Sequence, residues 1–407
     1  MKILILFCDM LRANLLRTFN SSIEQDGPMD QWFRRLGGTM YTNCYTPAPD
    51  TPRSMACFFT GRYPKHNGCY SRLQWPKYYL KANAKTFFDL FLENNYHLVM
   101  RVADTLERVG LLPLNITNEN PSIDIFHALS STVSELENRW STADKLLGFI
   151  SLPDYHMAMD DYGHNSWGDL FGQQHLANAC RMVFNTFQPD DFDYILVFSD
   201  HGCKLHEELA REGPLLLLND DRSKIVMLLR QKGDKTLQHC HDHTSIMDVL
   251  PTFRDILHIS QNPCVDGCSL FSPQADRFIV LEDHLGFPPK IGAIHELWGV
   301  RDTKFFYLES LSDKVLLNIS NDEQGTVVKD IDLAMVRQYQ TKIATFACSY
   351  TDNKKQHKIL EYYRAMKVDK DYYSDGEKRL TRGLSLLIKV KNRFFSRRYK
   401  NRYRRWP

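Results

Sequence analysis

Residues 2–9 read KILILFCD, and this stretch decides the fold class. Lys2 to Cys8 is a continuous β-prone, apolar run, which is typical of a strand buried on both faces of a parallel sheet. The run ends in Asp9, and open α/β sheets place ligands at the carboxyl ends of their strands. An aspartate in this place can also simply cap the next helix. The stretch therefore predicts the sheet and leaves the role of Asp9 open.

The chain up to about residue 275 alternates strand-like and helix-like segments, which is the pattern of an α/β domain with a mostly parallel sheet. Further strands are expected at residues 39–45, 96–102, 146–152, 193–198 and 225–229. Helices are expected at residues 28–37, 55–60 and 244–252. Beyond Arg277 the pattern changes to short strands joined by turns (RFIVLED, DTKFFYLE and DKVLLNIS), which predict a small antiparallel sheet.

These patterns predict three parts: an α/β domain over 1–275, an antiparallel-sheet subdomain over 276–330 and a helical region over 331–407. The net charge is only +2, so the molecule as a whole lacks the positive charge of a protein that binds polyanions. No apolar stretch approaches the roughly 20 residues that span a bilayer, and the apolar start is too short for a secretory signal. We expect a cytoplasmic protein, or one without its export signal, whose ten cysteines are mostly reduced core thiols.

The last 22 residues, LLIKVKNRFFSRRYKNRYRRWP (386–407), interleave basic and aromatic side chains. Such a segment favours an anionic membrane surface or nucleic acid, and a solvated charged helix is the plainer alternative. The near-neutral total charge and the absence of a nucleic-acid-binding motif favour the membrane. Peripheral binding to the inner face of a membrane is therefore expected, without a nucleic-acid partner.

Residues 47–68, PAPDTPRSMACFFTGRYPKHNG, place a hydroxyl side chain, Thr51, beside Pro52 and Arg53. The apolar run that follows predicts a buried helix whose N-terminus points at Thr51. Helix N-termini offer N–H groups and a positive dipole end to an anionic substrate. Thr51 could equally be the N-cap of this helix, with Pro52 at its first position. Capping and catalysis are compatible here.

Three further segments carry candidate metal ligands. The segment PDYHMAMDDYGHNSWG holds Asp154, His156, Asp160, Asp161 and His164. Asp160 and His164 stand four residues apart, a spacing that lets both converge on one ion, although a polar loop with incidental histidines is the alternative. Asp200 and His201 follow a predicted strand, and Gly202 permits a tight turn. Among His239, His241 and His243, we expect one functional histidine, His243, at the head of a helix.

Four segments in order, FCDMLR, TPRSMACFFTGRYP, FSDHG and HTSIMDVLPT, resemble the sulfatase-like branch of the alkaline phosphatase superfamily. The resemblance covers about residues 1–252. It implies an alkaline-phosphatase-like fold, with a mostly parallel central sheet flanked by helices.

The resemblance also implies a nucleophile. Sulfatases carry a Cys or Ser, matured to formylglycine, nine residues before the Thr of their T-G-R segment, and Thr51 stands at this place. Threonine cannot become formylglycine, and Met55 replaces a family arginine for which Arg53 could substitute. Superfamily members with Thr here are phosphodiesterases and phosphotransferases, including phosphoethanolamine and phosphoglycerol transferases. The implied chemistry moves from sulfate to phosphate.

One or two divalent ions (Zn, Mn, Mg or Ca) are implied in the same way. The first site would use Asp9, Thr51, Asp200 and His201, and the second Asp160, His164 and His243. Asp154 or His156 could replace members of the second trio. Thr51 would form a phospho-threonine intermediate, with Arg53 and the helix N-terminus neutralising phosphate oxygens. The expected substrate is a phosphoester of a small molecule, lipid or glycan; a sulfate ester hydrolase and a non-catalytic phospho-ligand-binding protein are the alternatives.

Overall fold

The structure is a computed structural model, and it describes residues 1–69, 80, 84–102, 120–205, 208, 218–260, 264–272, 274, 277–283, 297–310, 313–320, 325–329 and 332–348. The chain divides into two compact units, Met1–Asp352 and Asn353–Pro407. The basic tail at 386–407 lies outside the described residues. The predicted boundaries near residues 275 and 330 fall within the first unit.

An eight-stranded sheet forms the centre of the first unit, in the order β4-β3-β5-β1-β6-β7-β2-β8. The strands are β1 Lys2–Cys8, β2 Gly38–Tyr45, β3 His97–Arg101, β4 Ile123–Phe126, β5 Leu146–Leu152, β6 Tyr194–Phe198, β7 Met227–Gln231 and β8 Leu237–Ser245. β7 runs antiparallel to β6 and β2, and the other neighbours are parallel. The predicted mostly parallel sheet is confirmed.

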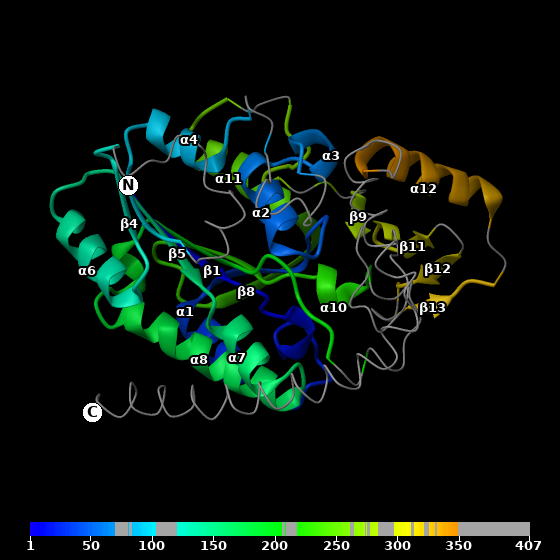
Figure 1. Cartoon of the computed structure of the whole chain (residues 1–407), viewed down its shortest axis with the longest axis horizontal. Coiled ribbons are helices and arrows are strands. Elements are labelled where there is room, and N and C mark those ends of the chain that lie inside the picture. The colour runs from blue at the N-terminus through cyan, green and yellow to red at the C-terminus, as the bar shows by residue number, and fades with distance from the viewer. Residues whose placement is uncertain are drawn as a thin grey trace, which may run out of the picture. The chain divides into compact units, whose positions relative to one another are not determined.

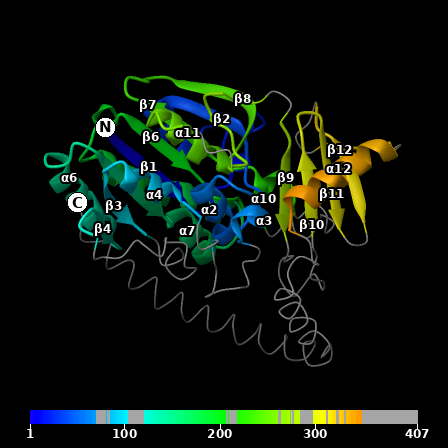
Figure 2. The same ribbon diagram turned by 90° about the horizontal axis from the view of Figure 1, so that it is seen from above.

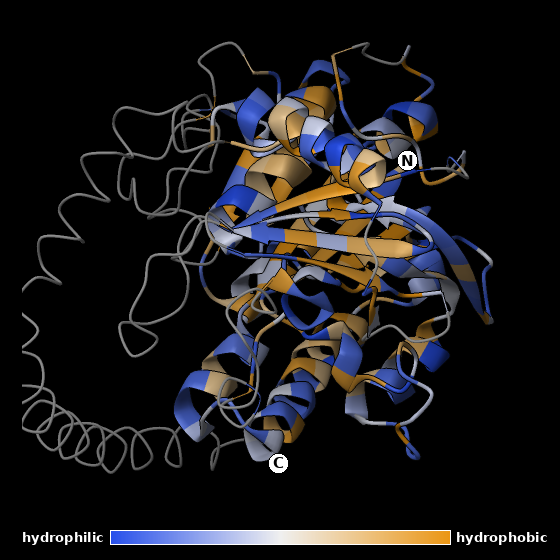
Figure 3. Cartoon of the chain, turned by 90° about the vertical axis from the view of Figure 1, so that its right-hand side faces the viewer, coloured by the Kyte–Doolittle hydropathy of each residue, from blue (hydrophilic) through white to orange (hydrophobic). Residues whose placement is uncertain are grey.

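β1 is buried on both faces, as its apolar run predicts. Alternate residues, such as Phe7 and Leu6, enter separate cores on the two sides of the sheet. One core is covered by α2 (Thr51–Thr60), α3 (Pro64–Asn67), α4 (Phe87–Glu93) and α11 (Val249–Ile256), and the other by α1 (Pro28–Leu36), α6 (Leu129–Trp140), α7 (Asp154–Tyr162) and α8 (Ser166–Phe184). Figure 3 shows the apolar strands between these helical layers.

A second, antiparallel sheet has the order β13-β12-β11-β10-β9. Its strands are β9 Ile279–Asp283, β10 Leu297–Arg301, β11 Phe305–Ser310, β12 Lys314–Asn318 and β13 Thr326–Val327, and α12 (Leu333–Phe346) packs against β9 and β10 (Figure 2). This confirms the predicted small antiparallel sheet. The Glu282 N–H donates to the Pro47 carbonyl at 2.8 Å, which joins β9 to the loop before α2.

Three local predictions differ from the structure. The helix predicted from Met55 begins at Thr51 itself, because Asp50 is the N-cap and accepts a hydrogen bond from the Arg53 N–H. The polar loop considered as an alternative at 154–162 is the helix α7. His243 does not head a helix; it lies within β8, opposite Asn43 of β2, because this parallel pairing continues to Ser245. No described helix combines the length and apolarity that crossing a membrane requires.

Candidate active site

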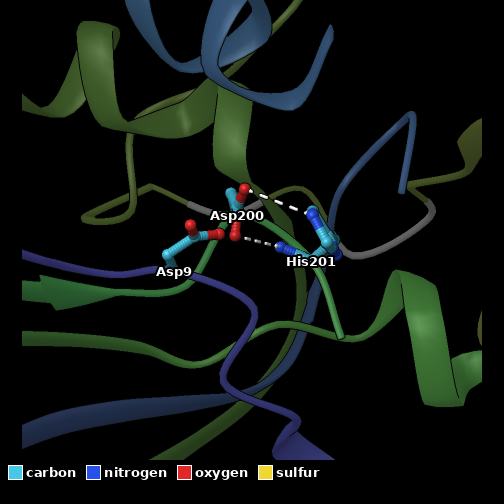
Figure 4. A group of neighbouring side chains, drawn as sticks. All are labelled: Asp9, Asp200 and His201. Atoms are coloured by element: carbon cyan, nitrogen blue, oxygen red, sulfur yellow. Dashed lines mark hydrogen bonds and ion pairs between the residues drawn. The ribbon is translucent and has the colours of Figure 1, made fainter. Parts of the chain in front are cut away.

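The candidate site lies where two neighbouring parallel strands end. Asp9 directly follows β1, and Asp200 and His201 follow β6. Adjacent parallel strands bring their carboxyl ends to one edge of the sheet, so these side chains meet although about 190 residues separate them. Asp9, Asp200 and His201 each offer one ligand atom within 4.8 Å of the others, and all three are buried (Figure 4).

Asp200 has one oxygen that is satisfied and one that is not. Its Oδ1 accepts the backbone N–H groups of Met10 at 3.0 Å and His201 at 2.9 Å. Met10 reaches this position through a left-handed backbone, φ 63°, which a non-glycine residue seldom adopts. Oδ2 is buried and accepts no hydrogen bond from the described residues. A buried carboxylate oxygen without a donor fits a cation ligand.

His201 faces this oxygen with its second ring nitrogen. Its Nδ1 lies 2.7 Å from the Gly202 carbonyl, and because a carbonyl only accepts, Nδ1 is the donor of this hydrogen bond. Nε2 lies 3.4 Å from Asp200 Oδ2. In the tautomer with its proton on Nδ1, Nε2 can bind a metal ion together with the two carboxylates. The residues present therefore fit a divalent metal ion.

Thr51 completes the group from the first position of α2. Its Oγ1 lies 3.4 Å from Asp9 Oδ1 and 3.3 Å from His201 Nε2, and its side chain is 5% exposed. Ser54 fixes the same helix turn by donating its hydroxyl to the Asp200 carbonyl at 2.7 Å. The predicted first set, Asp9, Thr51, Asp200 and His201, is thus assembled. The contribution of Ser54 had no signal in the sequence.

His156 is the further residue that contacts this group. Its Nδ1 lies 3.0 Å from Asp9 Oδ2, and its side chain is 32% exposed. Burial raises the pKa of Asp9, but the hydrogen bond and charge of His156, with His201 and Thr51, lower it overall. Burial lowers the pKa of His156, and the hydrogen bond and charge of Asp9 outweigh this and raise it to about 9. The sequence suggested His156 only as an alternative ligand of a second ion.

The predicted second trio is not assembled. Asp160 is two-thirds exposed on α7, where it lies 3.6 Å from His164 and 3.8 Å from His156. His243 lies on β8, and α7 follows β5. Five inter-strand spacings of about 4.8 Å each separate these two strands in the sheet. Among the described residues, Asp9, Asp200 and His201 form the one cluster of three ligands. Burial and the charge of Arg301 lower the pKa of His243 to about 4, so the His243 ring is neutral.

Arg53 does not face the site, contrary to the prediction. Its guanidinium is 1% exposed and pairs with Asp50 at 2.5 Å, Asp283 at 3.3 Å and Glu282 at 3.5 Å. The two acidic residues come from β9, so Arg53 joins α2 to the second sheet. Two N–H groups in the first turn of α2 are also committed: Arg53 N donates to Asp50 Oδ1 and Ser54 N to the Asp50 carbonyl. Neither Arg53 nor these donors can neutralise a phosphate oxygen.

Asp154, the other alternative ligand, lies at the start of α7 and is partly buried. Burial raises the pKa of Asp154, and the charge of Arg101 opposes that rise. Gly202 permits the close approach expected of it, because a Cβ at this position would lie 2.1 Å from the Asp221 carbonyl oxygen. The turn after His201 therefore requires glycine.

No family model and no curated protein matches the sequence. Solved structures do match the fold. A 2-O GAG sulfatase is 15% identical with a TM-score of 0.57, over 92% of this chain and 93% of that chain. A phosphonate monoester hydrolase from Silicibacter pomeroyi is 13% identical with a TM-score of 0.59, over 84% and 94%. A protein of the alkaline phosphatase superfamily from Vibrio parahaemolyticus is 12% identical with a TM-score of 0.58, over 86% and 88%.

Proposed function

We propose that this chain, which has the fold of sulfatases and phosphonate monoester hydrolases, is a metal-dependent enzyme that hydrolyses or transfers a phosphoester through Thr51. The observation that carries the proposal is the position of Thr51 Oγ1, 3.4 Å from Asp9 Oδ1 and 3.3 Å from His201 Nε2, beside the unsatisfied Asp200 Oδ2. A hydroxyl nucleophile placed among cation ligands is an arrangement that suits phosphoryl transfer.

The ligands of the ion would be Asp9, Asp200, His201 and Thr51. A divalent ion bound there lowers the pKa of a hydroxyl and stabilises charge on the attacking and leaving oxygens. Carboxylate, imidazole and hydroxyl ligands together favour Zn²⁺ or Mn²⁺ over Ca²⁺. Asp200 is held for this role by the N–H groups of Met10 and His201, which occupy its Oδ1 and leave Oδ2 facing the group.

The protein's own steps follow from this placement. The Thr51 hydroxyl loses its proton to water, and its Oγ1 forms a bond to phosphorus as the bond to the leaving oxygen breaks, which gives a phospho-threonine. Water or an acceptor alcohol then loses a proton as it attacks the same phosphorus. The bond from phosphorus to Oγ1 breaks in this second step, and Oγ1 takes up a proton again. Because Arg53 is buried in ion pairs, His156 is the better donor to a phosphate oxygen: it lies beside Asp9 and is one-third exposed.

The choice of phosphate over sulfate rests on the residue type at position 51. Threonine has no route to formylglycine, so it cannot carry out the aldehyde-hydrate chemistry implied for sulfatases. A sulfate ester hydrolase is therefore disfavoured, although the 2-O GAG sulfatase shares the fold. The substrate we propose is a phosphodiester on a lipid or a glycan. Its phosphate group would be of the phosphoethanolamine or phosphoglycerol type.

The basic aromatic tail supports a membrane surface as the place of action. Deleting residues 391–407 should release the protein from vesicles of 30% phosphatidylserine. Unchanged binding would remove the membrane from the proposal and leave the chemistry intact.

The experiment that tests the activity compares three small esters: bis(p-nitrophenyl) phosphate, p-nitrophenyl phosphate and p-nitrophenyl sulfate. Each is assayed with chelated protein reconstituted with Zn²⁺, Mn²⁺, Mg²⁺ or Ca²⁺, with and without a sugar acceptor. Metal-dependent turnover of a phosphate ester is expected. Turnover of the sulfate alone would contradict the proposal, and metal binding without turnover of any ester would favour a non-catalytic binding protein.

A further inference from the structure

The first turn of α2 carries a second buried hydroxyl group, that of Ser54, whose side chain is fully buried. Its Oγ donates to the carbonyl of Asp200 at 2.7 Å, across 146 positions of the chain. Ser54 follows Thr51 by three residues, so the two side chains lie on the same face of the helix. Both therefore face the segment that carries Asp200 and His201.

Ser54 departs from the usual behaviour of a hydroxyl group within a helix. Serine and threonine in a helix commonly donate to a carbonyl three or four residues earlier. Thr60 does this in the same helix, where its Oγ1 donates to the Ala56 carbonyl at 2.6 Å. Ser54 instead donates out of the helix, to the residue whose side chain is a candidate metal ligand. Its hydroxyl group thus joins α2 to the segment that follows β6.

The Ser54 hydroxyl group also accepts a hydrogen bond. Because its own proton goes to Asp200, its oxygen accepts from Thr46 Oγ1, which lies 2.7 Å away. Thr46 directly follows β2, and its N–H donates to the Ser223 carbonyl at 2.9 Å. Hydrogen bonds in such a chain polarise and strengthen one another. The three hydroxyl and carbonyl groups therefore connect the ends of β2 and β6 with the start of α2.

The rest of α2 is held mainly by apolar packing. Its residues from Met55 to Phe59 enter the apolar core, and α2 packs against α3 and α11 (Figure 1). Apolar packing is not directional, whereas a hydrogen bond fixes the separation of two named atoms. The bond from Ser54 therefore sets how closely this face of α2 approaches Asp200.

The contacts of Thr51 depend on that approach. Thr51 Oγ1 lies 3.3 Å from His201 Nε2 and 3.4 Å from Asp9 Oδ1, and both distances exceed the 2.7 Å of the Ser54 bond. Hydrogen bonds as long as these are weak, so they do little to hold the helix in place. An ion that takes ligands from α2 and from the strand ends binds most tightly when their separation is fixed beforehand.

We propose that Ser54 is a positioning residue, which holds Thr51 at the distance from Asp200 at which both can bind one divalent ion. Only the use of this arrangement in turnover rests on the proposed function. The binding of the ion is measured without any ester.

Titration calorimetry of Mn²⁺ into the chelated full chain compares Ser54→Ala with Ser223→Ala. Ser223 is the matched control, because it is also fully buried and its Oγ donates to a carbonyl, that of Asn219, at 2.8 Å within α10 (Asp220–Ser223) and its cap. Each variant loses one buried hydroxyl group, so both should unfold at similarly lowered urea concentrations. Ser54→Ala should weaken Mn²⁺ binding about tenfold or more, and Ser223→Ala less than about twofold.

The dependence on Thr51 separates positioning from a general effect on the fold. In Thr51→Ala the helix supplies no ligand, so adding Ser54→Ala should weaken Mn²⁺ binding less than about twofold. With bis(p-nitrophenyl) phosphate and saturating Mn²⁺, Ser54→Ala should lower kcat about tenfold or more and leave KM nearly unchanged. If Ser54→Ala does not fold, Thr46→Val takes its place, because it removes the donor to Ser54 from outside the helix. It should weaken Mn²⁺ binding about twofold or more.

Equal Mn²⁺ affinities of Ser54→Ala and Ser223→Ala would overturn the proposal, and so would an equal loss from Ser54→Ala with and without Thr51. Where Thr46→Val is the test, an unchanged affinity would overturn it. Mn²⁺ binding that depends on Ser54, without turnover of any ester, contradicts only the proposed function. Metal-dependent turnover that Ser54→Ala leaves unchanged contradicts this inference alone, and a wild type that binds no Mn²⁺ contradicts both.

Discussion

The Oγ1 of Thr51 lies 3.3 Å from Nε2 of His201, although 150 residues separate the two in the chain. Nδ1 of the same ring donates to the Gly202 carbonyl, so Nε2 is the nitrogen that faces Thr51. The threonine hydroxyl is therefore held against an imidazole and beside the Asp9 carboxylate. The same residues form the candidate cation site, and a divalent ion bound there would lower the pKa of this hydroxyl.

Replacing Thr51 should separate chemistry from folding. Thr51→Ala removes the nucleophile and should lower turnover of bis(p-nitrophenyl) phosphate by about 10³-fold or more. Thr51→Ser keeps the hydroxyl and should retain measurable turnover. Thermal unfolding should change little, because the side chain contributes one methyl group to packing and α2 is capped by Asp50. Near-wild-type turnover by the alanine variant would refute the nucleophile assignment.

Replacing Asp200 should abolish metal binding and should stabilise the metal-free protein. Without metal, Asp9 and Asp200 are two buried carboxylates in one site, so Asp200→Asn should raise the unfolding temperature of the chelated protein. Zn²⁺ or Mn²⁺ should raise the unfolding temperature of the wild type and leave that of Asp200→Asn nearly unchanged. Differential scanning calorimetry with and without chelator measures both. Equal metal stabilisation of the two proteins would show that Asp200 is no ligand.

Arg53 should behave as a structural residue. Arg53→Met removes the cation that Asp50 and Glu282 share and should destabilise the protein by about 3–5 kcal/mol, which urea unfolding would detect. Lys304→Met, on the exposed rim of the second sheet, is the control and should change stability by less than about 0.5 kcal/mol. If Arg53→Met kept its stability and lost only turnover, the original prediction that Arg53 contacts phosphate would be restored.

The sequence could predict the site residues that follow strands. It could not predict contacts between side chains that lie far apart in the chain. Asp9 and Asp200 could be found because each follows an apolar strand, and neighbouring parallel strands converge. The burial of Arg53 could not, because its partners in β9 lie about 230 residues away. The sequence of α7 does contain a helical pattern, because its buried residues, Tyr155, Ala158 and Met159, follow helical spacing. The many acidic residues and histidines between them favoured the interpretation as a polar loop.

Asp169 should make stability depend on pH. Burial raises the pKa of Asp169 to about 6, against hydrogen bonds from Tyr155 and Gln173 that lower it. The folded state therefore binds a proton that the unfolded chain, with a pKa near 3.8, has lost. The contribution of Asp169 to the free energy of unfolding should be greatest below about pH 4. Between pH 4 and pH 6 it should fall by on the order of 2 kcal/mol, and above pH 6 it should stay low.

The variant Asp169→Asn should remove this slope and unfold at a higher urea concentration than the wild type at pH 7. Asparagine can accept from Tyr155 with its oxygen, and Gln173 Oε1, which accepts nothing from the described residues, can turn to meet the new amide. Urea unfolding at pH 4, 5, 6 and 7 measures the difference. Parallel curves for the two proteins would contradict the raised pKa.

One ion should bind to each chain. Asp160 and His164 contact each other, and His243 lies across the sheet, so these three side chains cannot hold a common ion in this arrangement. Inductively coupled plasma mass spectrometry of the reconstituted protein should find one equivalent of metal per chain. The double change Asp160→Asn and His164→Asn should leave that content unchanged, whereas Asp200→Asn should abolish it. Two equivalents in the wild type that fall to one in the double variant would restore the predicted second site and require α7 to move toward β8.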